Sequence, residues 1–282
     1  MSLSREELGS LLERTSRTFA LAIPLLDEPL RTDVGIAYLL FRVADTLEDA
    51  TEWDRDRRVR ALSAFEGWLS GGDDGWIEEA RRSPPTKDVN CMDLLARAND
   101  VLAAAGPLVS KHVGRTSALM ASFVSRHTDE GSLVLRDIPD LRAYCYAVAG
   151  IVGELLTELW VERVPSLEGA RAALMENAPA FGEGLQLVNI LKDAPSDAEA
   201  GRVYVPPSVP RAEVVAIARA DLVQARAYVD TLARAGAPPS VRAFCELPLR
   251  LAVATIDRLE QGAAKLGRDE VMQIFADVTG PR

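Results

Sequence analysis

Cysteine is scarce in this chain of 282 residues, which contains only three: Cys91, Cys145 and Cys245. They lie far apart in the sequence, and no CxxC motif is present. An odd number of widely spaced cysteines is typical of buried, reduced thiols in a cytosolic protein rather than of a disulfide framework. We therefore expect a cytoplasmic protein without disulfides.

Long apolar runs and targeting signals are also missing. The lack of any run of about 18 apolar residues predicts that no segment spans a bilayer. The N-terminus does not show the basic, apolar and small-residue pattern of a secretory signal. Contact with a membrane surface remains open. The expected location is thus the cytoplasm, with peripheral contact at the inner membrane face as an alternative.

An excess of positive charge is absent as well. The chain has 32 Lys and Arg against 42 Asp and Glu, which gives a formal net charge of -10. A nucleic-acid-binding protein usually carries a basic face, so this balance argues against a nucleic-acid partner. An acidic protein that binds an anionic substrate needs local Arg and Lys, or a divalent cation between the two negative parties.

Strand patterns are almost absent, and helical patterns fill the chain. Aromatic residues make up only 6% of it, while the abundant Ala and Leu favour helix. "RVYV" at 202–205 is the only segment with local strand character, and no βαβ rhythm or GxGxxG after a strand is present. The expected helices cover 4–22, 31–52, 55–70, 89–104, 107–127, 138–162, 167–175, 178–194, 211–235 and 238–265.

The predicted architecture is an all-α, bundle-like domain over residues 1–282. With 48% hydrophobic residues, the chain is long enough to bury a large core, in one large domain or two modest ones. "RRSPPTKD" at 81–88 is a clear linker, but it does not separate two plausible cores. We therefore expect a single domain.

The stretch "YLLFRVADTLED" at 38–49 carries a narrow polar band on an apolar helix. Tyr38, Arg42, Asp45 and Asp49 have the spacing of one helical face, and Glu48 lies beside them. One interpretation is a solvated face with Arg42 paired to an aspartate. The other is a metal site, because clustered carboxylates repel one another without a cation and Mg²⁺ prefers oxygen ligands.

A second polar band lies in "FGEGLQLVNILKDAPSD" at 181–197, where Gln186, Asn189, Asp193 and Asp197 share one face. Pro195 opposes a straight helix, which predicts that Asp197 lies just past the helix end. Two acid-bearing helices in an all-α protein are suited to a metal–diphosphate, in which Mg²⁺ holds the leaving group. We expect the two sets of carboxylates to meet across an apolar cavity.

The chain resembles the squalene/phytoene synthase family, a group of head-to-head prenyl transferases, in motifs that occur in the family's order. The resemblance covers about residues 8–259 and is closest to squalene synthases. The motifs are "TSRTFALAI" (15–23), "AYLLFRVADTLED" (37–49), "YCYAVAGIVGELL" (144–156), "LQLVNILKDAPSDAEAGRVYVP" (185–206) and "FCELPLRLAVATI" (244–256). The resemblance implies an isoprenoid synthase helical bundle around a central apolar cavity.

The resemblance also implies roles for individual residues. The implied Mg²⁺ ligands are Asp45, Glu48, Asp49, Asp193 and Asp197. The implied substrate-binding residues are Ser16, Arg17, Phe19, Arg42, Gln186, Asn189, Lys192 and Arg202. The tyrosines implied to lie near the departing diphosphate are Tyr38, Tyr144 and Tyr204, and Tyr144 is the candidate for steering the proton lost on cyclopropane closure. Guanidinium groups suit phosphate oxygens, and electron-rich rings suit a passing carbocation.

Several positions depart from the family pattern or keep two interpretations. Lys192 stands where Arg is common, Ser196 where Glu is common, and Ala147 where squalene synthases often carry an aromatic. Gly150 and Gly153 remove side chains from one helix face, for close packing or for a prenyl tail. Apolar residues with the same two interpretations, tunnel lining or ordinary core, are Phe19, Phe41, Val148, Ile151, Leu155, Leu185 and Val188.

The expected function is Mg²⁺-dependent condensation of two farnesyl diphosphates to presqualene diphosphate or squalene. The alternative within the family is a phytoene or dehydrosqualene synthase, and a further alternative is a non-catalytic scaffold or assembly relative on the same fold. If squalene is the product, a reductant is required, for which NADPH is the family's implied donor. The DTLED form and "FCELP" favour the squalene assignment.

Overall fold

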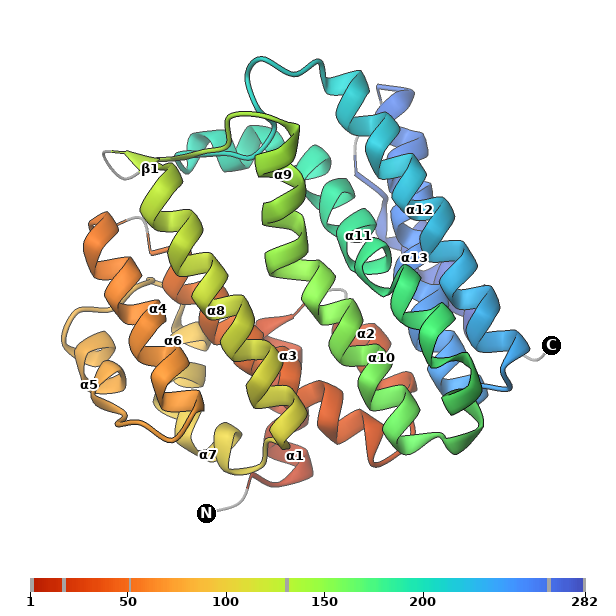
Figure 1. Cartoon of the computed structure of the whole chain (residues 1–282), viewed down its shortest axis with the longest axis horizontal. Helices are drawn as coiled ribbons and strands as arrows, with labels where there is room; N and C mark the ends of the chain where they lie inside the picture. The colour runs from red at the N-terminus through yellow and green to blue at the C-terminus, as the bar shows by residue number, and fades with distance from the viewer. Residues whose placement is uncertain (1–2, 17–18, 51, 130–131, 263–264, 281–282) are drawn as a thin grey trace. The chain divides into compact units, whose positions relative to one another are not determined.

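The computed structural model describes residues 3–16, 19–50, 52–129, 132–262 and 265–280. It confirms the all-α prediction, since helices occupy most of these residues (Figure 1). The residues group into two compact units, which we describe separately. Unit 1 comprises 1–20, 28–134 and 199–203; unit 2 comprises 21–27, 135–198 and 204–282. The single-domain assignment for 1–282 stays a prediction.

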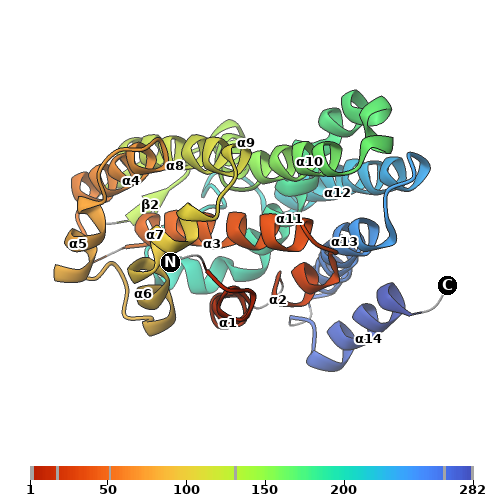
Figure 2. The same cartoon turned by 90° about the horizontal axis from the view of Figure 1, so that it is seen from below.

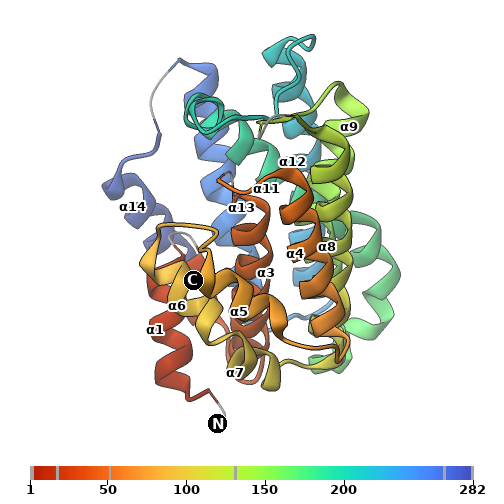
Figure 3. The same ribbon diagram turned by 90° about the vertical axis from the view of Figure 1, so that its left-hand side faces the viewer.

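Unit 1 is built around one long buried helix. Its elements are α1 (Arg5–Thr15), α3 (Leu30–Glu48), α4 (Arg55–Leu69), α5 (Gly75–Arg82), α6 (Val89–Ala96), α7 (Ala98–Ala103), α8 (Pro107–His127), β1 (Thr128–Asp129), β2 (Ser132–Val134) and β3 (Arg202–Val203). The central helix α3 packs against α1, α4, α6, α7 and α8, and α4 lies along α8 (Figure 3). Nearly every α3 residue from Val34 to Glu48 is buried, so α3 provides much of the unit 1 core.

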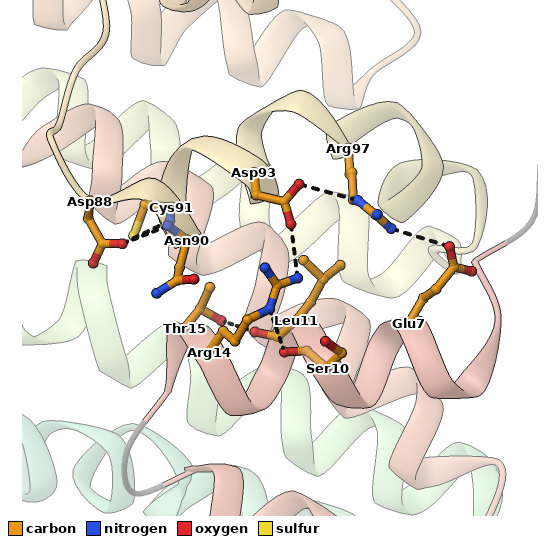
Figure 4. Close-up of polar contacts among 10 residues, drawn as sticks. All are labelled: Glu7, Ser10, Leu11, Arg14, Thr15, Asp88, Asn90, Cys91, Asp93 and Arg97. Atoms are coloured by element: carbon orange, nitrogen blue, oxygen red, sulfur yellow. Dashed lines mark hydrogen bonds and ion pairs between the residues drawn. The ribbon is translucent and has the colours of Figure 1, made fainter.

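Helix α1 packs against α6, and ion pairs join it to Asp93 on α6 and to Arg97, the residue between α6 and α7 (Figure 4). Arg14 Nη2 lies 2.9 Å from Asp93 Oδ2, and Arg97 lies 3.5 Å from Asp93 and 3.3 Å from Glu7. Ser4 caps the N-terminus of α1 through a reciprocal capping box with Glu7. These contacts fix the segment that leads into Ser16.

A small three-stranded sheet places Arg202 within unit 1. β1 pairs antiparallel with β2, and β2 pairs parallel with β3, so that Leu133 lies opposite Arg202. Gly201, at φ 75, makes the turn before β3, a backbone conformation that glycine adopts at low cost. The strand character predicted for "RVYV" is therefore confirmed at Arg202–Val203, whereas β1 and β2 were not expected.

Unit 2 contains the longest helices of the chain. Its elements are α9 (Ile138–Cys145), a π-helical turn (Tyr146–Gly150), α10 (Ile151–Arg163), a 3-10 turn (Pro165–Ala170), α11 (Arg171–Glu199), α12 (Arg211–Arg234), α13 (Pro239–Glu260) and α14 (Arg268–Thr279). The short helix α2 (Phe19–Ala22) continues into a 3-10 turn, Ile23–Leu25, which packs on α13. α13 packs against both α12 and α14 (Figure 2).

Several predicted helix boundaries are wrong. The helix expected over 4–22 stops at Thr15, where Ser16 is extended, and resumes at Phe19. The one expected over 89–104 divides at Arg97, the helix expected to reach 52 ends at Glu48, and α5 and α14 were not expected. The two helices expected over 167–175 and 178–194 form one, α11, with Pro179 and Pro195 inside it.

The continuation of α11 past Pro195 has a physical cause. Proline lacks the N–H that would bond the carbonyl of Leu191 four residues earlier. Arg211 Nη2 donates to that Leu191 oxygen instead, at 2.8 Å. Asp197 accordingly lies on the helix, and the prediction that it lies past the helix end is wrong.

One described helix, Ile138–Arg163, is long and apolar enough to cross a membrane by length and composition alone. The sequence had predicted no such segment. Within its most apolar window, 67% of the residues are buried inside the protein, as in the core helix of a folded domain. Length and composition are therefore weak evidence for a membrane span here.

Candidate active-site residues and family membership

The first acidic motif lies on α3, in unit 1, as a strip of partly exposed side chains. Between Val34 and Glu48 only Tyr38, Arg42 and Asp45 are not buried, and Asp49 follows as the exposed residue that ends the helix. The predicted face is thus present in the structure. Such a strip on an otherwise buried helix differs from an ordinary solvated face, where one side of the helix would be broadly exposed.

Arginines lie close to both aspartates of this strip. Arg42 Nη1 is 4.0 Å from Asp45 Oδ2, and Arg202 Nη1 is 3.5 Å from Asp49 Oδ1. Arg42 also donates to the Sγ of Cys91, which is buried, at 3.7 Å. The structure therefore groups Arg42, Arg202 and the two aspartates in unit 1, and their roles in binding metal and phosphate stay predictions.

Asp45 is the residue of the strip whose charged form is disfavoured by its surroundings. Enclosure raises the pKa of its carboxyl to about 7, Arg42 opposes this effect, and the like charge of Asp49 adds to it. The side chain still keeps 42% of its surface accessible. The raised pKa means that neighbouring groups do not compensate the negative charge of the Asp45 carboxylate. An accessible carboxylate of this kind is suited to binding a cation that arrives with the substrate.

Glu48 differs from its two acidic neighbours. It is 4% exposed, and its backbone carbonyl accepts a hydrogen bond from Arg58 Nη1 at 3.2 Å. The sequence placed Glu48 beside the aspartates because a residue three positions along a helix is adjacent, but packing has buried it. Its role as a metal ligand stays a prediction.

The N-terminal motif borders this strip. Tyr38 Oη donates to the Thr15 carbonyl at 3.0 Å, and the Tyr38 ring lies 5.7 Å from the Phe19 ring. Ser16 Oγ accepts a hydrogen bond from the N–H of Ala20 in α2, at 3.2 Å. Arg17, also predicted to bind substrate, lies outside the described residues. Burial raises the pKa of Tyr38, so its hydroxyl stays protonated at neutral pH.

The second acidic motif lies on α11, in unit 2. Leu187, Ile190 and Leu191 are buried, as predicted for the opposite side of the helix. The polar residues Gln186, Asn189, Lys192, Asp193 and Asp197 all keep exposure. Lys192 Nζ donates to Asn189 Oδ1 at 2.8 Å and lies 3.3 Å from Asp193 Oδ2.

Lys265, which the sequence analysis did not single out, also binds Asp193. Its Nζ lies 2.6 Å from Asp193 Oδ1, so two lysines hold the two oxygens of one carboxylate. Lys265 comes after α13 and is 72 residues from Asp193. No local pattern connects residues so far apart, so sequence periodicity could not have found this pair.

Tyr144 and Tyr204 form a stacked pair in unit 2. Their ring centroids are 4.8 Å apart with an interplanar angle of 25°, and both side chains are buried. The two tyrosines predicted to lie near one leaving group are therefore neighbours. A buried pair of electron-rich rings is the kind of surface that stabilises a nearby cation.

The donor set fits a magnesium ion that is shared with a substrate. Within the residues described, no three His, Cys, Asp or Glu side chains form a ready-made metal cluster. Mg²⁺ is commonly held by one or two carboxylates together with waters and substrate phosphates. Asp45 with Asp49, and Asp193 with Asp197, are pairs of that kind, with Arg or Lys nearby for phosphate oxygens.

Solved structures resemble this fold and define its class. A complex of TcSQS with the ligand E5700 is 26% identical, with a TM-score of 0.76, covering 97% of this chain and 85% of that one. A complex of TcSQS with BPH1237 gives a TM-score of 0.74. The squalene synthase HpnC from Alicyclobacillus acidocaldarius, 20% identical with a TM-score of 0.57, supports the fold alone. With the sequence relatives below, they identify an all-α prenyl transferase.

Sequence comparisons then identify the family. A family model described as squalene/phytoene synthase matches residues 12–211. Human squalene synthase is 27% identical over 99% of this chain and 70% of its own length. Squalene synthase R6 of a Phoma species is 31% identical over 70% of this chain and 46% of its own length. The chain belongs to the squalene/phytoene synthase family, which confirms the predicted enzyme class.

Proposed function

We propose that this enzyme condenses two farnesyl diphosphates head to head, with Mg²⁺, to presqualene diphosphate and then to squalene when NADPH is supplied. The observation that carries the proposal is the strip on α3, where Asp45 and Asp49 keep exposure on a buried helix beside Arg42 and Arg202. The similarity to named squalene synthases supports farnesyl diphosphate over a longer substrate.

The proposed chemistry starts with departure of one diphosphate. When bound, Mg²⁺ neutralises charge that develops on the leaving oxygen. Asp45 and Asp49 would hold the Mg²⁺ of one diphosphate, and Arg42 and Arg202 would donate to the phosphate oxygens of that diphosphate. Asp193 and Asp197, with Lys192, do the same for the other diphosphate.

The remaining steps form and rearrange a carbon–carbon bond. The allylic cation is attacked by the double bond of the second substrate, and loss of a proton closes a cyclopropane. Tyr144, stacked on Tyr204, faces the cation with its ring and steers the departing proton toward the released diphosphate. Squalene formation then requires departure of the second diphosphate, rearrangement of the resulting cyclopropylcarbinyl cation and its quenching by a hydride from NADPH, whereas presqualene diphosphate keeps that diphosphate and needs no hydride.

Product analysis tests this proposal. Purified protein is incubated with Mg²⁺ and either farnesyl or geranylgeranyl diphosphate, with and without NADPH, and pyrophosphate and products are measured by mass spectrometry. We expect a 30-carbon diphosphate from farnesyl diphosphate alone and squalene when NADPH is added. A faster reaction with geranylgeranyl diphosphate, giving a 40-carbon hydrocarbon, would favour a phytoene synthase. A desaturated 30-carbon product would favour a dehydrosqualene synthase.

Removing Lys265 should strengthen Mg²⁺ binding. The ammonium of Lys265 donates a hydrogen bond to Asp193 Oδ1, an oxygen that a bound metal would need, so Mg²⁺ would have to displace Lys265. Because Lys265 is 61% exposed, the pair is worth at most about 1 kcal/mol, which corresponds to a two- to fivefold lower Kd in Lys265→Ala. Calorimetric titration with Mg²⁺ measures this change.

Lys87→Ala is the matched control for this titration. It removes a lysine whose Nζ lies 2.6 Å from Glu52, in an equally short surface pair on unit 1. We expect the Mg²⁺ affinity of Lys87→Ala to equal that of the wild type. Weaker Mg²⁺ binding by Lys265→Ala would show that Lys265 supports the site instead of competing for it.

A further inference from the structure

A partly buried ionic cluster joins α9, α11 and α12, three helices of unit 2 that Figure 1 labels. Arg142 on α9 donates through Nη1 to Asp221 Oδ2 on α12, and its Nη2 lies 3.2 Å from Glu183 Oε2 on α11. Glu183 is 6% exposed and Asp221 3%. We refer to Arg142, Glu183 and Asp221 as the triad.

Glycines clear space around both carboxylates of the triad. A Cβ on Gly150 would lie 3.2 Å from Glu183 Oε1, and a Cβ on Gly184 would lie 3.1 Å from the Asp221 Cβ. The backbone of α11 is thus close to the π-helical turn on one side and to α12 on the other. Single π-helical turns within helices are frequent at functional sites.

The triad is a costly arrangement if its only purpose is stability. It buries two carboxylates beside one arginine that is 36% exposed, and well-packed apolar residues of similar volume are often as stabilising as a buried ionic group or more so. What charged groups add is direction. The guanidinium of Arg142 is planar and faces one carboxylate with each of its two terminal nitrogens, so it constrains the rotation of α9 relative to two other helices.

The triad lies next to the proposed catalytic residues. Arg142 is two residues before Tyr144, which places the two side chains on opposite sides of α9. Glu183 is three residues before Gln186, on the same face of α11. A rotation of α9 that releases Arg142 would therefore change the direction of the Tyr144 ring relative to the Tyr204 ring on which it stacks.

We propose that the triad of Arg142, Glu183 and Asp221 is a positioning device that holds Tyr144 in its stacked orientation against Tyr204. The proposal rests on the proposed function, in which Tyr144 steers the proton lost on cyclopropane closure. The three residues do not touch substrate in this role; they act through α9. Their loss lowers turnover by misdirecting Tyr144 while substrate binding is retained.

The direct test observes Tyr144 without substrate. The protein is labelled with 3-fluorotyrosine, which gives five signals because the chain has five tyrosines, and each is assigned by a Tyr→Phe substitution. In Glu183→Gln we expect the ¹⁹F signals of Tyr144 and Tyr204 to shift, because these rings stack. The signal of Tyr38, which lies in unit 1, should stay in place. Asp221→Asn provides the same test if Glu183→Gln does not fold.

The kinetic test separates positioning from binding. A misplacement of about 1 Å can cost about a hundredfold in rate, so we expect kcat to fall about ten- to hundredfold in Glu183→Gln, with KM changed less than about twofold. Arg142→Lys, which keeps the charge but loses the second donating nitrogen of the fork, should lie between Glu183→Gln and the wild type.

Glu246→Gln is the matched control. Glu246 accepts from Arg226 at 2.6 and 3.0 Å between α13 and α12, so the variant also removes one carboxylate from an arginine pair of unit 2. It should leave the Tyr144 signal and kcat unchanged. If Glu183→Gln lowers the melting temperature but leaves the Tyr144 signal and kcat unchanged, the triad is only structural and the proposal is wrong.

The two proposals can fail separately. If the wild type releases no pyrophosphate from farnesyl diphosphate, the proposed function is wrong, and the ¹⁹F signals still decide whether the triad orients Tyr144. If the wild type is active and the Tyr144 signal does not respond to either triad variant, the positioning role alone is overturned.

The pH dependence of stability provides a further readout of Glu183. Burial raises the pKa of Glu183 from 4.5 to about 7. The negative charge of Asp221 also raises this pKa, whereas the positive charge of Arg142 lowers it. Cys145, on α9, is a further titratable group near these charges. Between pH 4.5 and about pH 7 the folded state keeps a proton on Glu183 that the unfolded state has lost, so the free energy of unfolding falls as pH rises. The loss of melting temperature from pH 5 to 8 should therefore be smaller in Glu183→Gln than in the wild type.

Discussion

Replacing Asp45 with asparagine will lower the rate of pyrophosphate release about a thousandfold. The substitution keeps the size of the side chain and removes the negative charge with which, in our proposal, Asp45 binds Mg²⁺. A bound metal contributes several kcal/mol to stabilising the charge of a leaving group, and each 1.36 kcal/mol is worth a factor of ten in rate. Release of pyrophosphate from farnesyl diphosphate at saturating Mg²⁺ measures the effect.

This loss should occur without a loss of stability. Enclosure and Asp49 both disfavour the charged form of Asp45, so a neutral amide at this position should not lower the melting temperature. The control is Asp56→Asn on α4, where the carboxylate is 70% exposed and lies 3.1 Å from Arg55 Nε. It should release pyrophosphate at the wild-type rate. An Asp45→Asn enzyme within about tenfold of the wild-type rate would contradict the metal role of the α3 strip.

Replacing Gly153 with alanine will destabilise unit 2 strongly, because the added methyl group has no space. A Cβ at this position would lie 1.9 Å from the carbonyl oxygen of Ala178, and a Cβ on Gly182 would lie 2.0 Å from that of Ala149. Both obstacles are backbone atoms, so α10 and α11 would have to separate. We expect a loss of about 3 kcal/mol or more, at the upper end for overpacking, and a melting temperature lower by about 6–12 °C.

Gly114→Ala is the matched control for this substitution. Gly114 also lies inside a long helix, α8, but a Cβ there would meet only the Cγ of Glu66 at 3.8 Å, an ordinary contact. Alanine should stabilise that helix by about 0.5–1 kcal/mol because glycine is a poor helix former. If Gly153→Ala melts at or above the wild-type temperature, α10 and α11 are not as close as the structure shows.

The two glycines of "AGIVG" show a choice that the sequence left open and that the structure decides. The GxxG spacing indicated that one helix face lacks side chains, and it allowed either close packing or space for a prenyl tail. At Gly153 the structure decides for packing, since the backbone of Ala178 lies where a side chain would be. The choice depends on a residue 25 positions away, which no local pattern contains.

Proline and lysine positions make the same point. The rule that proline ends a helix predicted a break at Pro195, but Arg211 supplies the hydrogen bond that proline cannot make. No local pattern connects Lys265 with Asp193, because the two are 72 residues apart. Rules based on single residues hold until a distant group compensates for the local loss.

The amino-acid sequence by itself determined the helical class, the polar strips of α3 and α11, and the family through the order of its motifs. These features follow from a period of 3.6 residues and from residue types within a short window, both of which are local. Only the tertiary structure decided that Glu48 is buried beside two accessible aspartates, that Tyr144 stacks on Tyr204, and that the triad joins three helices. Such contacts depend on which helices pack together, and packing is a property of the whole fold.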